Sequence, residues 1–475
     1  MLEICKSFFE HLNKQQVRYC HWKSNEHLEE ALRGETDLDV LVHIDDKEAL
    51  EASFAIFPFK KILSPPEKQF PGMSDYLGFD EETGELIHLH VHHYLVLGQK
   101  YIKNHYLPLE DWVFDNLILR GSVYIPCPEV ELLFLVIRAN MKPDMLSLVK
   151  HAIKDCTSAH YTAYPQSIEQ EFFSLIDQAD QEKLNTLLLQ SGLPLNPELY
   201  SDFIDVFSRK ELKFYHIIKA QFVLLQALQD YRRDKTVLVH WRYFQFFAAT
   251  LPVIKHFKNF KRKTIDGTAK SFAIVGADGS GKSTLIADLN KWLSWKLTVK
   301  QYYYGIPKNT INRVKSFLQR VFNKLGLTSA VQALDERFWI YVANYRRQIS
   351  FAIRNDVIEG KVVITDRFPL KAFHSMAVPM DGPRLGLPDI HVESAKIQQE
   401  LDLYDQIQLP DRIFVLQVDI DELRRRKTDL TLETHQLKAQ AVNKLVGDET
   451  TILINANKSY DEVILEIKCL IWSEL

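Results

Sequence analysis

The chain has 475 residues, too many for one ordinary hydrophobic core, so two or three domains are expected. Hydrophobic residues make up 46% and charged residues 25%, the proportions of a soluble globular protein. The net charge of −4 gives no overall positive excess, so we expect no nucleic acid partner.

The five cysteines lie far apart and form no CxxC pair. This spacing indicates reduced structural thiols in a cytoplasmic protein, without a zinc site or a disulfide framework. The first residues, MLEICKSFFEHLNKQQ, lack the basic start, apolar core and cleavage site of a signal peptide, so they predict an amphipathic helix.

Two strands are predicted in the N-terminal part, at 34–44 (GETDLDVLVHI) and 86–96 (LIHLHVHHYLV). Alternate residues on a strand share a face, so Asp37 and Asp39 point in the same direction. Two carboxylates on one face offer the hard oxygen ligands that Mg²⁺ prefers. The alternative is an acidic strand that faces solvent.

The stretch 20–42 (CHWKSNEHLEEALRGETDLDVLV) resembles the nucleotidyltransferase fold, in which a Gly-Ser turn precedes a strand bearing Asp-x-Asp. Ser24 stands in the serine position, but the glycine is missing. The resemblance implies a third carboxylate from a later strand, and 86–96 offers His88, His90 and His92 instead. His90 is the expected substitute as metal ligand. The alternative is a packed or solvated histidine-rich strand, in a domain retained for binding only.

From residue 126 to about 255 the apolar spacing is helical, which predicts a helical companion to the first domain. A basic linker is expected at 256–267, because 255–263 (KHFKNFKRK) contains no acidic residue. The aromatic stretch before it is too short to span a bilayer. A weak contact of 241–263 with an anionic membrane surface is one hypothesis, and a buried helix followed by a charged linker is the other.

The stretch 272–284 (FAIVGADGSGKST) is a strand followed by the phosphate-loop pattern GxxxxGK[ST] and the start of a helix. Backbone N–H groups of such a loop bind the phosphates of ATP, the lysine reaches the β- and γ-phosphates, and the hydroxyl holds Mg²⁺. The expected ATP-binding residues are Gly276, Gly279, Ser280, Gly281, Lys282, Ser283 and Thr284, with Ser283 also as metal ligand. Further strands at 362–365, 413–418 and 451–455 alternate with helices, which predicts a parallel sheet.

The C-terminal part, roughly 270–475, resembles the thymidylate kinase family in four motifs: GADGSGKST, ANYRRQISFAIRNDVIEG, EGKVVITDRF and LPDRIFVLQVDIDELRRRKTD. The resemblance implies that Asp278 faces the acceptor, that Asp366 holds the metal and that Arg367 binds the transferring phosphate. It also implies that Arg346 grips the acceptor phosphate. The alternatives are a turn aspartate at 278 and a solvated helix face at 346.

Phosphoryl transfer also needs a cation for the charge that develops in the transition state. The phosphate loop contains no arginine at its variable positions, so the cation is expected from the arginine-rich lid: Arg424, Arg425 and Arg426. This sequence departs from the family pattern in one segment that bears on the identity of the substrate. The family's Arg-Glu-Pro segment is replaced by YYYGIPKN (302–309), which puts thymidylate itself in doubt as the acceptor.

The sequence therefore predicts an α/β multidomain protein with an N-terminal α+β nucleotidyltransferase-like domain (1–125), a helical middle region (126–255) and a C-terminal P-loop α/β parallel-sheet kinase domain (268–475). The expected function is an ATP- and Mg²⁺-dependent kinase acting on a nucleotide or another small phosphorylated acceptor, such as a sugar or lipid-linked precursor. The alternatives are a nucleotidyltransferase with the P-loop domain as an NTP-gated regulator, and a non-catalytic nucleotide sensor. The sequence is also compatible with a homodimer.

Overall fold

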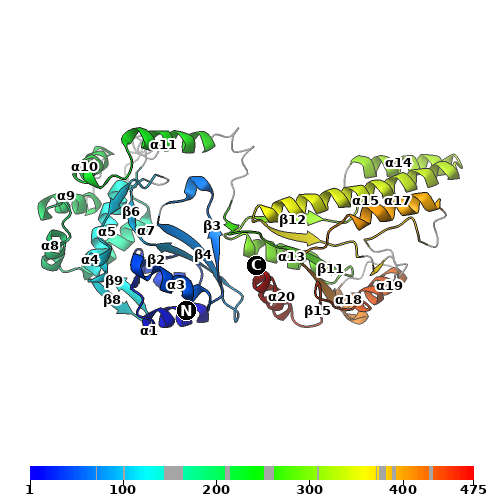
Figure 1. The fold of residues 1–475 in the computed structure, drawn as a ribbon, viewed down its shortest axis with the longest axis horizontal. Helices are drawn as coiled ribbons and strands as arrows, with labels where there is room; N and C mark the ends of the chain where they lie inside the picture. The colour runs from blue at the N-terminus through cyan, green and yellow to red at the C-terminus, as the bar shows by residue number, and fades with distance from the viewer. Residues whose placement is uncertain are drawn as a thin grey trace. The chain divides into compact units, whose positions relative to one another are not determined.

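The computed structural model describes residues 1–70, 72–99, 102–143, 164–208, 214–250, 262–307, 310–370, 372–373, 381–387, 392–426 and 432–475. The chain divides into two compact units, Met1–Lys261 (unit 1) and Arg262–Leu475 (unit 2) (Figure 1). The sequence predictions had separate parts at 1–125 and 126–255, which both fall within unit 1, and a linker at 256–267, which spans the division.

Unit 1 contains a mixed sheet in which five strands run in the order β1-β2-β5-β4-β3. β2 and β5 are parallel, and the other neighbours are antiparallel. The two predicted strands correspond to β2 and to β5 with β6. The strands of unit 1 are β1 (Tyr19–His21), β2 (Leu38–Val42), β3 (Phe59–Leu63), β4 (Met73–Phe79), β5 (Leu86–His92), β6 (Leu95–Leu97), β7 (His105–Leu107), β8 (Leu117–Arg120) and β9 (Val123–Pro126).

The helices of unit 1 cover this sheet and continue into the helical region. They are α1 (Glu3–Lys14), α2 (Leu28–Ala31), α3 (Lys47–Phe54), α4 (Glu110–Phe114), α5 (Pro128–Met141), α7 (Gln166–Gln178), α8 (Gln181–Gln190), α9 (Pro197–Ser208), α10 (Phe214–Ala227) and α11 (Thr236–Thr250). α1 is amphipathic as predicted and buries Phe8, Phe9 and Leu12. α5 is buried almost all round and joins one core with Trp22 and Leu41 of the sheet region, so strands and helices of unit 1 share a core.

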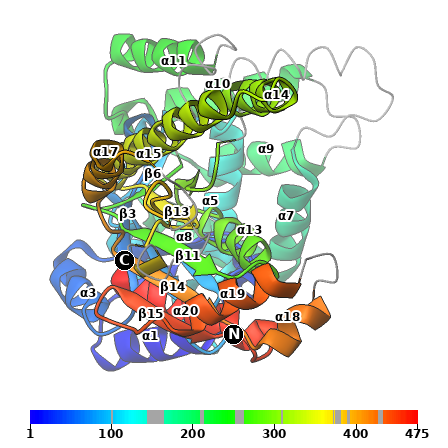
Figure 2. The ribbon, with the colours of Figure 1, turned by 90° about the vertical axis from the view of Figure 1, so that its right-hand side faces the viewer.

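Unit 2 contains a fully parallel five-stranded sheet in the order β12-β13-β11-β14-β15, which confirms the predicted parallel sheet (Figure 2). Its strands are β11 (Ser271–Gly276), β12 (Val299–Tyr303), β13 (Val362–Asp366), β14 (Arg412–Gln417) and β15 (Thr451–Asn455), and a short strand β10 (Thr264–Ile265) precedes them. β12 was not predicted. Its residues are partly exposed and mostly polar at the sheet edge, so they lack the continuous apolar run of the other strands.

Helices connect the parallel strands, as such crossovers require. They are α13 (Lys282–Leu293), α14 (Thr310–Lys324), α15 (Thr328–Ile358), α17 (Ser394–Asp405), α18 (Ile420–Arg426) and α19 (Leu432–Asn443). A further helix, α20 (Tyr460–Glu474), follows the last strand. After β11 the chain first builds β12 and β13 on one side and then β14 and β15 on the other. In open α/β sheets, ligands bind at the carboxyl ends of strands where the order changes side in this way.

In the part of the chain that the structure describes, no helix combines the length and the apolar composition needed to cross a bilayer. The predicted membrane-surface segment 241–263 lies largely outside the described residues, because 251–261 and the side chains of 245–250 are not described.

Candidate functional site

The phosphate loop connects β11 to α13, as the sequence predicts. Gly279 and Gly281 both have a φ of 89°, a left-handed conformation that favours glycine, and Gly281 caps α13. A Cβ atom on Gly276 would lie 2.6 Å from Ser280 Oγ, so a side chain at 276 would crowd the loop. The result is a tight turn that leads directly into the N-terminus of a three-turn helix. This arrangement is suited to binding phosphate.

Lys282 lies inside this loop. Its Nζ donates to Gly276 O at 2.8 Å and to Ala277 O at 2.6 Å, and the side chain is buried. Burial lowers the pKa of Lys282 to about 8, although Asp278 and Asp366 act in the opposite direction. Ser283, the next residue, is exposed in the first turn of α13. The loop thus has a cation within it and an accessible hydroxyl beside it.

Asp366 and Arg367 lie at the carboxyl end of β13, the strand next to β11. Asp366 is opposite Ile274, two residues before the phosphate loop. Burial raises the pKa of Asp366, against the influence of Arg367 and Lys282. Arg367 has a φ of 71°, and its N–H donates to Ile274 O at 3.0 Å, so the chain turns sharply and stays bonded to β11. The structure therefore places the predicted Asp-Arg pair beside the loop.

Asp278 is held between two cations. Its Oδ2 lies 2.9 Å from Lys438 Nζ and its Oδ1 lies 3.5 Å from Arg367 Nη2. Burial raises the pKa of Asp278, but Lys438, Lys282 and Arg367 outweigh it, so the net pKa is lowered and the side chain is ionised. Lys438 comes from α19, and the sequence analysis missed it. Residues 278 and 438 are 160 positions apart, and no motif marks the lysine.

Arg346 is buried, with 1% of its surface exposed, and it joins the same network through Asp381. Arg346 Nη2 donates to Asp381 Oδ1 at 3.0 Å, and Arg367 Nη1 donates to Asp381 Oδ2 at 2.9 Å. Arg346 also donates to Tyr404 Oη and to Tyr304 O, at 2.6 Å each. The two arginines that were predicted to bind phosphate thus both donate to the carboxylate of Asp381. The sequence analysis did not single out this aspartate.

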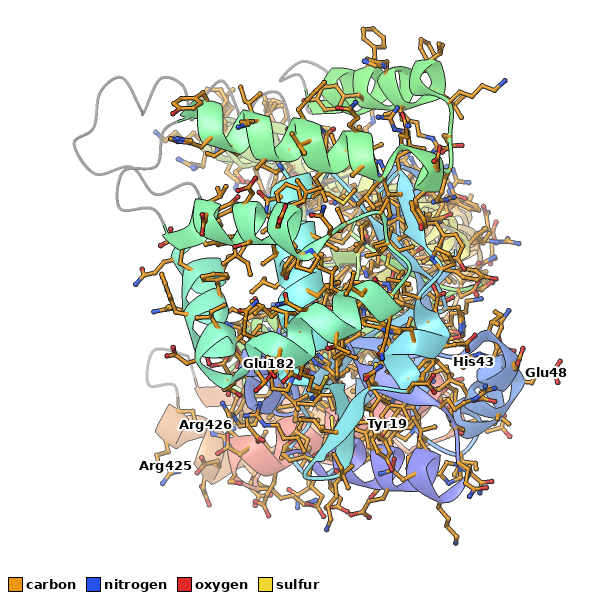
Figure 3. The ribbon with its side chains drawn as sticks, turned by 90° about the vertical axis from the view of Figure 1, so that its left-hand side faces the viewer. Tyr19, His43, Glu48, Glu182, Arg425 and Arg426 are labelled. Carbon is orange, nitrogen blue, oxygen red and sulfur yellow. The ribbon has the colours of Figure 1, made fainter. Side chains whose placement is uncertain are left out.

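The lid arginines are placed differently. Arg425 and Arg426 project from α18, and both donate to Glu422 Oε1 on the same helix, at 2.9 Å and 2.7 Å (Figure 3). Arg425 is largely exposed. The side chain of Arg424 lies outside the described residues, as does the segment 427–431. Arg426 Nη2 also donates to Ala456 O at 3.1 Å. In the described part of the lid, therefore, Arg425 and Arg426 contact Glu422 of their own helix and the segment after β15.

In unit 1 the predicted Asp–His residues lie together across three strands. Asp39 on β2 and Asp75 on β4 both pair with His90 on β5, in parallel and antiparallel register. His90 Nδ1 lies 3.2 Å from Asp39 Oδ1, and His90 Nε2 lies 3.1 Å from Asp75 Oδ1. Asp75 is the acid that the sequence analysis did not find. It was sought on the strand of His90 and lies on the neighbouring strand.

Two further histidines of β5 complete this cluster, which we call the Asp–His cluster. His88 Nδ1 lies 2.8 Å from Asp37 Oδ1, and His92 Nε2 lies 3.2 Å from Asp39 Oδ1. The three histidines therefore share one face, as predicted. Ligand atoms of Asp37, His88 and His90 lie within 4.8 Å of one another, and so do those of Asp39, His90 and His92.

The charges of the cluster are set by its surroundings. Burial lowers the pKa of His90 and lowers that of His92 to about 3, so both imidazoles are neutral at physiological pH. Burial raises the pKa of Asp39, but Lys23, whose Nζ lies 2.8 Å from Asp39 Oδ1, and the two histidines hold it well below its usual range. Asp39 is therefore ionised and His90 and His92 are neutral, which are the states that bind metals.

A basic pocket of about 370 Å³ adjoins the cluster through Lys23. Lys23 and Arg138 both lie over the ring of Trp22, at 5.0 Å and 5.5 Å from its centroid. Lys103 lines the same pocket, and burial lowers its pKa to about 8. Partly desolvated cations that line one pocket favour an anionic ligand.

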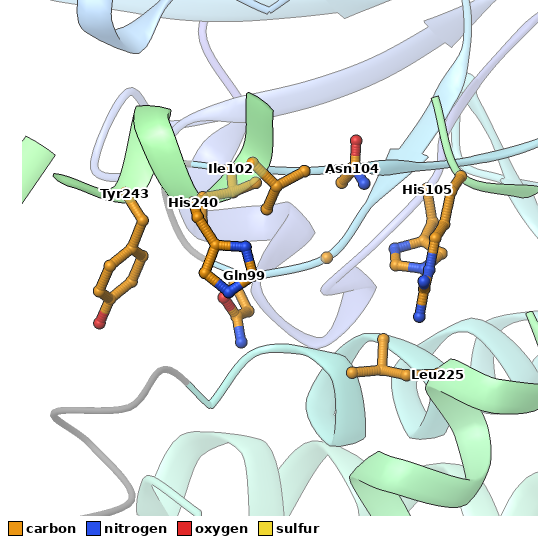
Figure 4. Close-up of a pocket in the computed structure, with 10 residues that line it drawn as sticks. Gln99, Ile102, Asn104, His105, Leu225, His240 and Tyr243 are labelled. Carbon is orange, nitrogen blue, oxygen red and sulfur yellow. The ribbon is translucent and has the colours of Figure 1, made fainter. Parts of the chain in front are cut away.

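A second pocket of about 270 Å³ lies between the region of β7 and the helices α10 and α11 (Figure 4). Asn104, His105, His240 and Tyr243 line it together with apolar residues. His105 is buried, burial lowers its pKa to about 4, and neither ring nitrogen has a hydrogen-bond partner among the described residues. Tyr243 belongs to the segment 241–263 that the sequence analysis considered for a membrane contact, and the sequence analysis assigned no role to the other lining residues.

No family model matches the chain. A curated relative, the uncharacterized ATP-binding protein YghR of Escherichia coli strain K12, is 29% identical over 210 residues, covering 40% of this chain and 82% of the relative. Among solved structures, the chain is similar to thymidylate kinase from Candida albicans, with 17% identity and a TM-score of 0.30 over 44% of this chain and 93% of that one. It is also similar to deoxyadenosine kinase from M. mycoides, with 16% identity and a TM-score of 0.30 over 43% of this chain and all of that one. Each similarity covers less than half of this chain.

Proposed function

We propose that unit 2 is an ATP- and Mg²⁺-dependent phosphotransferase of the thymidylate kinase type, acting on a nucleotide or another small phosphorylated acceptor. The observation that carries the proposal is the convergence of the phosphate loop, Asp366 and Arg367 at the carboxyl ends of two adjacent parallel strands. The ATP-binding relative is consistent with it.

The loop residues have separate roles in this proposal. Backbone N–H groups from Gly279 to Ser283 bind phosphate oxygens, and Lys282 turns from the loop carbonyls to the β- and γ-phosphates. Ser283 and Asp366 supply the oxygens that would hold Mg²⁺, a hard cation that prefers such ligands. Mg²⁺, when bound, would neutralise charge on the transferring phosphoryl group.

The acceptor would lie on the side of Asp278 and Asp381. Asp278 is ionised and can accept a hydrogen bond from an acceptor hydroxyl. Arg346 and Arg367 each donate to one oxygen of the Asp381 carboxylate, and this spacing of donors supports a role in binding an oxyanion. An acceptor phosphate would replace this carboxylate, so the acceptor is expected to be phosphorylated.

Lys438 is our candidate for the cation that stabilises the transition state. It contacts the phosphate loop through Asp278 in the structure, whereas Arg425 and Arg426 contact Glu422. The predicted role of Arg424 stays a prediction.

The test is incubation of the full chain with Mg·ATP and a mixed pool of nucleotides, sugar phosphates and cell extract, with products read by mass spectrometry. A gain of one phosphoryl group on a pool component, lost in Lys282→Ala, is the expected result. Lys282→Ala removes a contact to charge that grows in the transition state. ATP binding without any phosphorylated product would favour the regulator or sensor alternatives instead.

A second candidate function belongs to unit 1, where Asp75 on β4 adds a third carboxylate to Asp39 on β2 and to Asp37, which directly precedes β2. Together with the motif resemblance, this favours a nucleotidyltransferase-like domain that binds a metal–NTP complex. Pyrophosphate release and a nucleotidyl gain in the same mass-spectrometric experiment would support it. An unchanged pattern in Asp75→Asn would count against it.

A further inference from the structure

We infer that the Asp–His cluster of unit 1 binds a divalent transition-metal ion, with Asp39, His90 and His92 as its protein ligands. The inference rests on the geometry of unit 1 and not on the phosphotransferase proposed for unit 2. It changes the earlier expectation of an oxygen site for Mg²⁺, because two of the three ligands are imidazoles. It involves no cysteine, so the widely spaced cysteines do not argue against it.

The distances between the ligand atoms suit one ion. Zn²⁺–ligand bonds of about 2.0–2.1 Å in tetrahedral geometry place neighbouring ligand atoms roughly 3.3 Å apart. Asp39 Oδ1 lies 3.2 Å from His90 Nδ1 and 3.2 Å from His92 Nε2. The three residues come from two paired strands, β2 and β5, so the sheet fixes their spacing. All three ligand atoms lie within 4.8 Å of one another.

His90 lies between two carboxylates. Its Nδ1 lies 3.2 Å from Asp39 Oδ1, and its Nε2 lies 3.1 Å from Asp75 Oδ1. With an ion bound by Nδ1 and Asp39, the Asp75 carboxylate would lie on the outer side of the imidazole, where outer-shell carboxylates orient histidine ligands in metal sites.

His43 provides a matched control from the same unit. Its Nε2 lies 2.8 Å from Asp111 Oδ1 and its Nδ1 lies 3.5 Å from Asp45 Oδ2. It belongs to neither of the two groups of closely spaced ligand atoms found among the described residues.

The donor set also indicates the class of ion. Two imidazoles and one carboxylate with open positions are the ligands of transition metals such as Fe²⁺, Co²⁺ and Zn²⁺, and Mg²⁺ prefers oxygen. Lys23 Nζ, now 2.8 Å from Asp39 Oδ1, would be displaced toward the basic pocket that it lines. Binding should therefore follow the order Zn²⁺ > Mn²⁺, with Mg²⁺ far weaker.

The test uses the full chain, stripped of metals with a chelator and titrated calorimetrically with Zn²⁺, Co²⁺, Mn²⁺ and Mg²⁺. We expect one site per chain that binds Zn²⁺ at least tenfold more tightly than Mg²⁺. Bound Co²⁺ should give the visible absorption bands of a low-symmetry site with nitrogen ligands. His92→Gln and Asp39→Asn should each weaken Zn²⁺ binding by at least about tenfold, since even outer-shell changes cost 10- to 100-fold.

His43→Gln should leave Zn²⁺ binding unchanged. Circular dichroism and thermal unfolding show whether each variant folds, and Asp39→Asn keeps the size of the side chain if His92→Gln does not fold. Zn²⁺ binding that is equal in the wild type and in both cluster variants would overturn the inference, and so would binding of Mg²⁺ alone. Neither result would bear on phosphorylation by unit 2, which the Lys282→Ala comparison tests separately.

Discussion

At the scale of single residues, Asp278 links the phosphate loop to two cations from elsewhere in unit 2. Its carboxylate contacts Lys438 and Arg367, and it is the acid that distinguishes this loop from a purely phosphate-binding one. In the proposed function it accepts a hydrogen bond from the acceptor. A role of Asp278 in binding the acceptor can be distinguished from a role in shaping the loop. The KM for the acceptor and the KM for ATP are measured independently.

Asp278→Asn should raise the KM for the acceptor about 10- to 100-fold, the value of a hydrogen bond to a charged group, and should raise the KM for ATP much less. Steady-state kinetics with each substrate varied in turn check this. Asp288→Asn is a matched control, since Asp288 lies farther along α13 and bonds Tyr460. A rise in the KM for ATP alone would mean that Asp278 shapes the loop and does not contact the acceptor.

Lys282 makes stability depend on pH. Its pKa is about 8 in the folded protein and has the usual value of 10.5 in the unfolded chain. Between these two values the unfolded chain binds more protons, so the contribution of Lys282 to stability rises with pH across this window.

Lys282→Met removes this titration but keeps an extended side chain. From pH 8 to pH 10.5, the free energy of unfolding of the wild type should therefore gain up to about 3 kcal/mol relative to that of the variant. Urea unfolding of both proteins at several pH values measures the difference. A difference that stays constant with pH would show that the ammonium group is not desolvated.

At the scale of elements, the strands that could be predicted were those with continuous apolar runs between turn signals. β11, β13 and β14 are buried along most of their length, and their sequences show it. β15, at the opposite edge from β12, is only partly buried, but its sequence TILIN contains three apolar residues and was predicted. β12 at the sheet edge is not buried along most of its length, and it was missed. The residues of the candidate sites could likewise be predicted only where the local sequence marks them. The motif residues were found, but Asp75, Asp381 and Lys438 were not, because they contact the motifs only through the fold.

Helix α19 is an element whose part in the site follows from the structure alone. Lys438→Ala should lower kcat about 100-fold, a typical effect of removing one group that stabilises transition-state charge, if this lysine follows the transferring phosphoryl group. Arg425→Ala on α18 removes an exposed cation that contacts Glu422 and should change kcat less than threefold. Single-turnover rates at saturating ATP check both. Equal losses of kcat in the two variants would count against Lys438 as the cation that stabilises the transition state and would favour the lid arginines.

At the scale of the whole molecule, the two units have separate cores and separate candidate sites. The Asp–His cluster lies on the mixed sheet of unit 1, and the phosphate loop lies on the parallel sheet of unit 2. Each site is built from residues of its own unit, so neither needs the other's metal.

The double variant Asp37→Ala, Asp39→Ala should therefore phosphorylate the acceptor at the wild-type rate while losing Zn²⁺ binding. Product formation with Mg·ATP and calorimetric titration on the same preparation test both halves of this prediction. A parallel loss of phosphorylation in a folded variant would show that the units depend on each other chemically.

The left-handed backbone conformation of Arg367 lowers the stability of the protein at a residue that the proposed activity requires. A φ of 71° costs a residue with a Cβ atom about 1 kcal/mol more than it costs glycine, and folding must bear this cost to present the guanidinium. Arg367→Ala and Arg367→Gly lose the same ion pairs, so both should be inactive. The glycine variant should nevertheless be more stable than the alanine variant by about 1 kcal/mol, the reverse of their order in a helix. Denaturant unfolding of the two variants measures how much stability the protein gives up to hold this side chain in place.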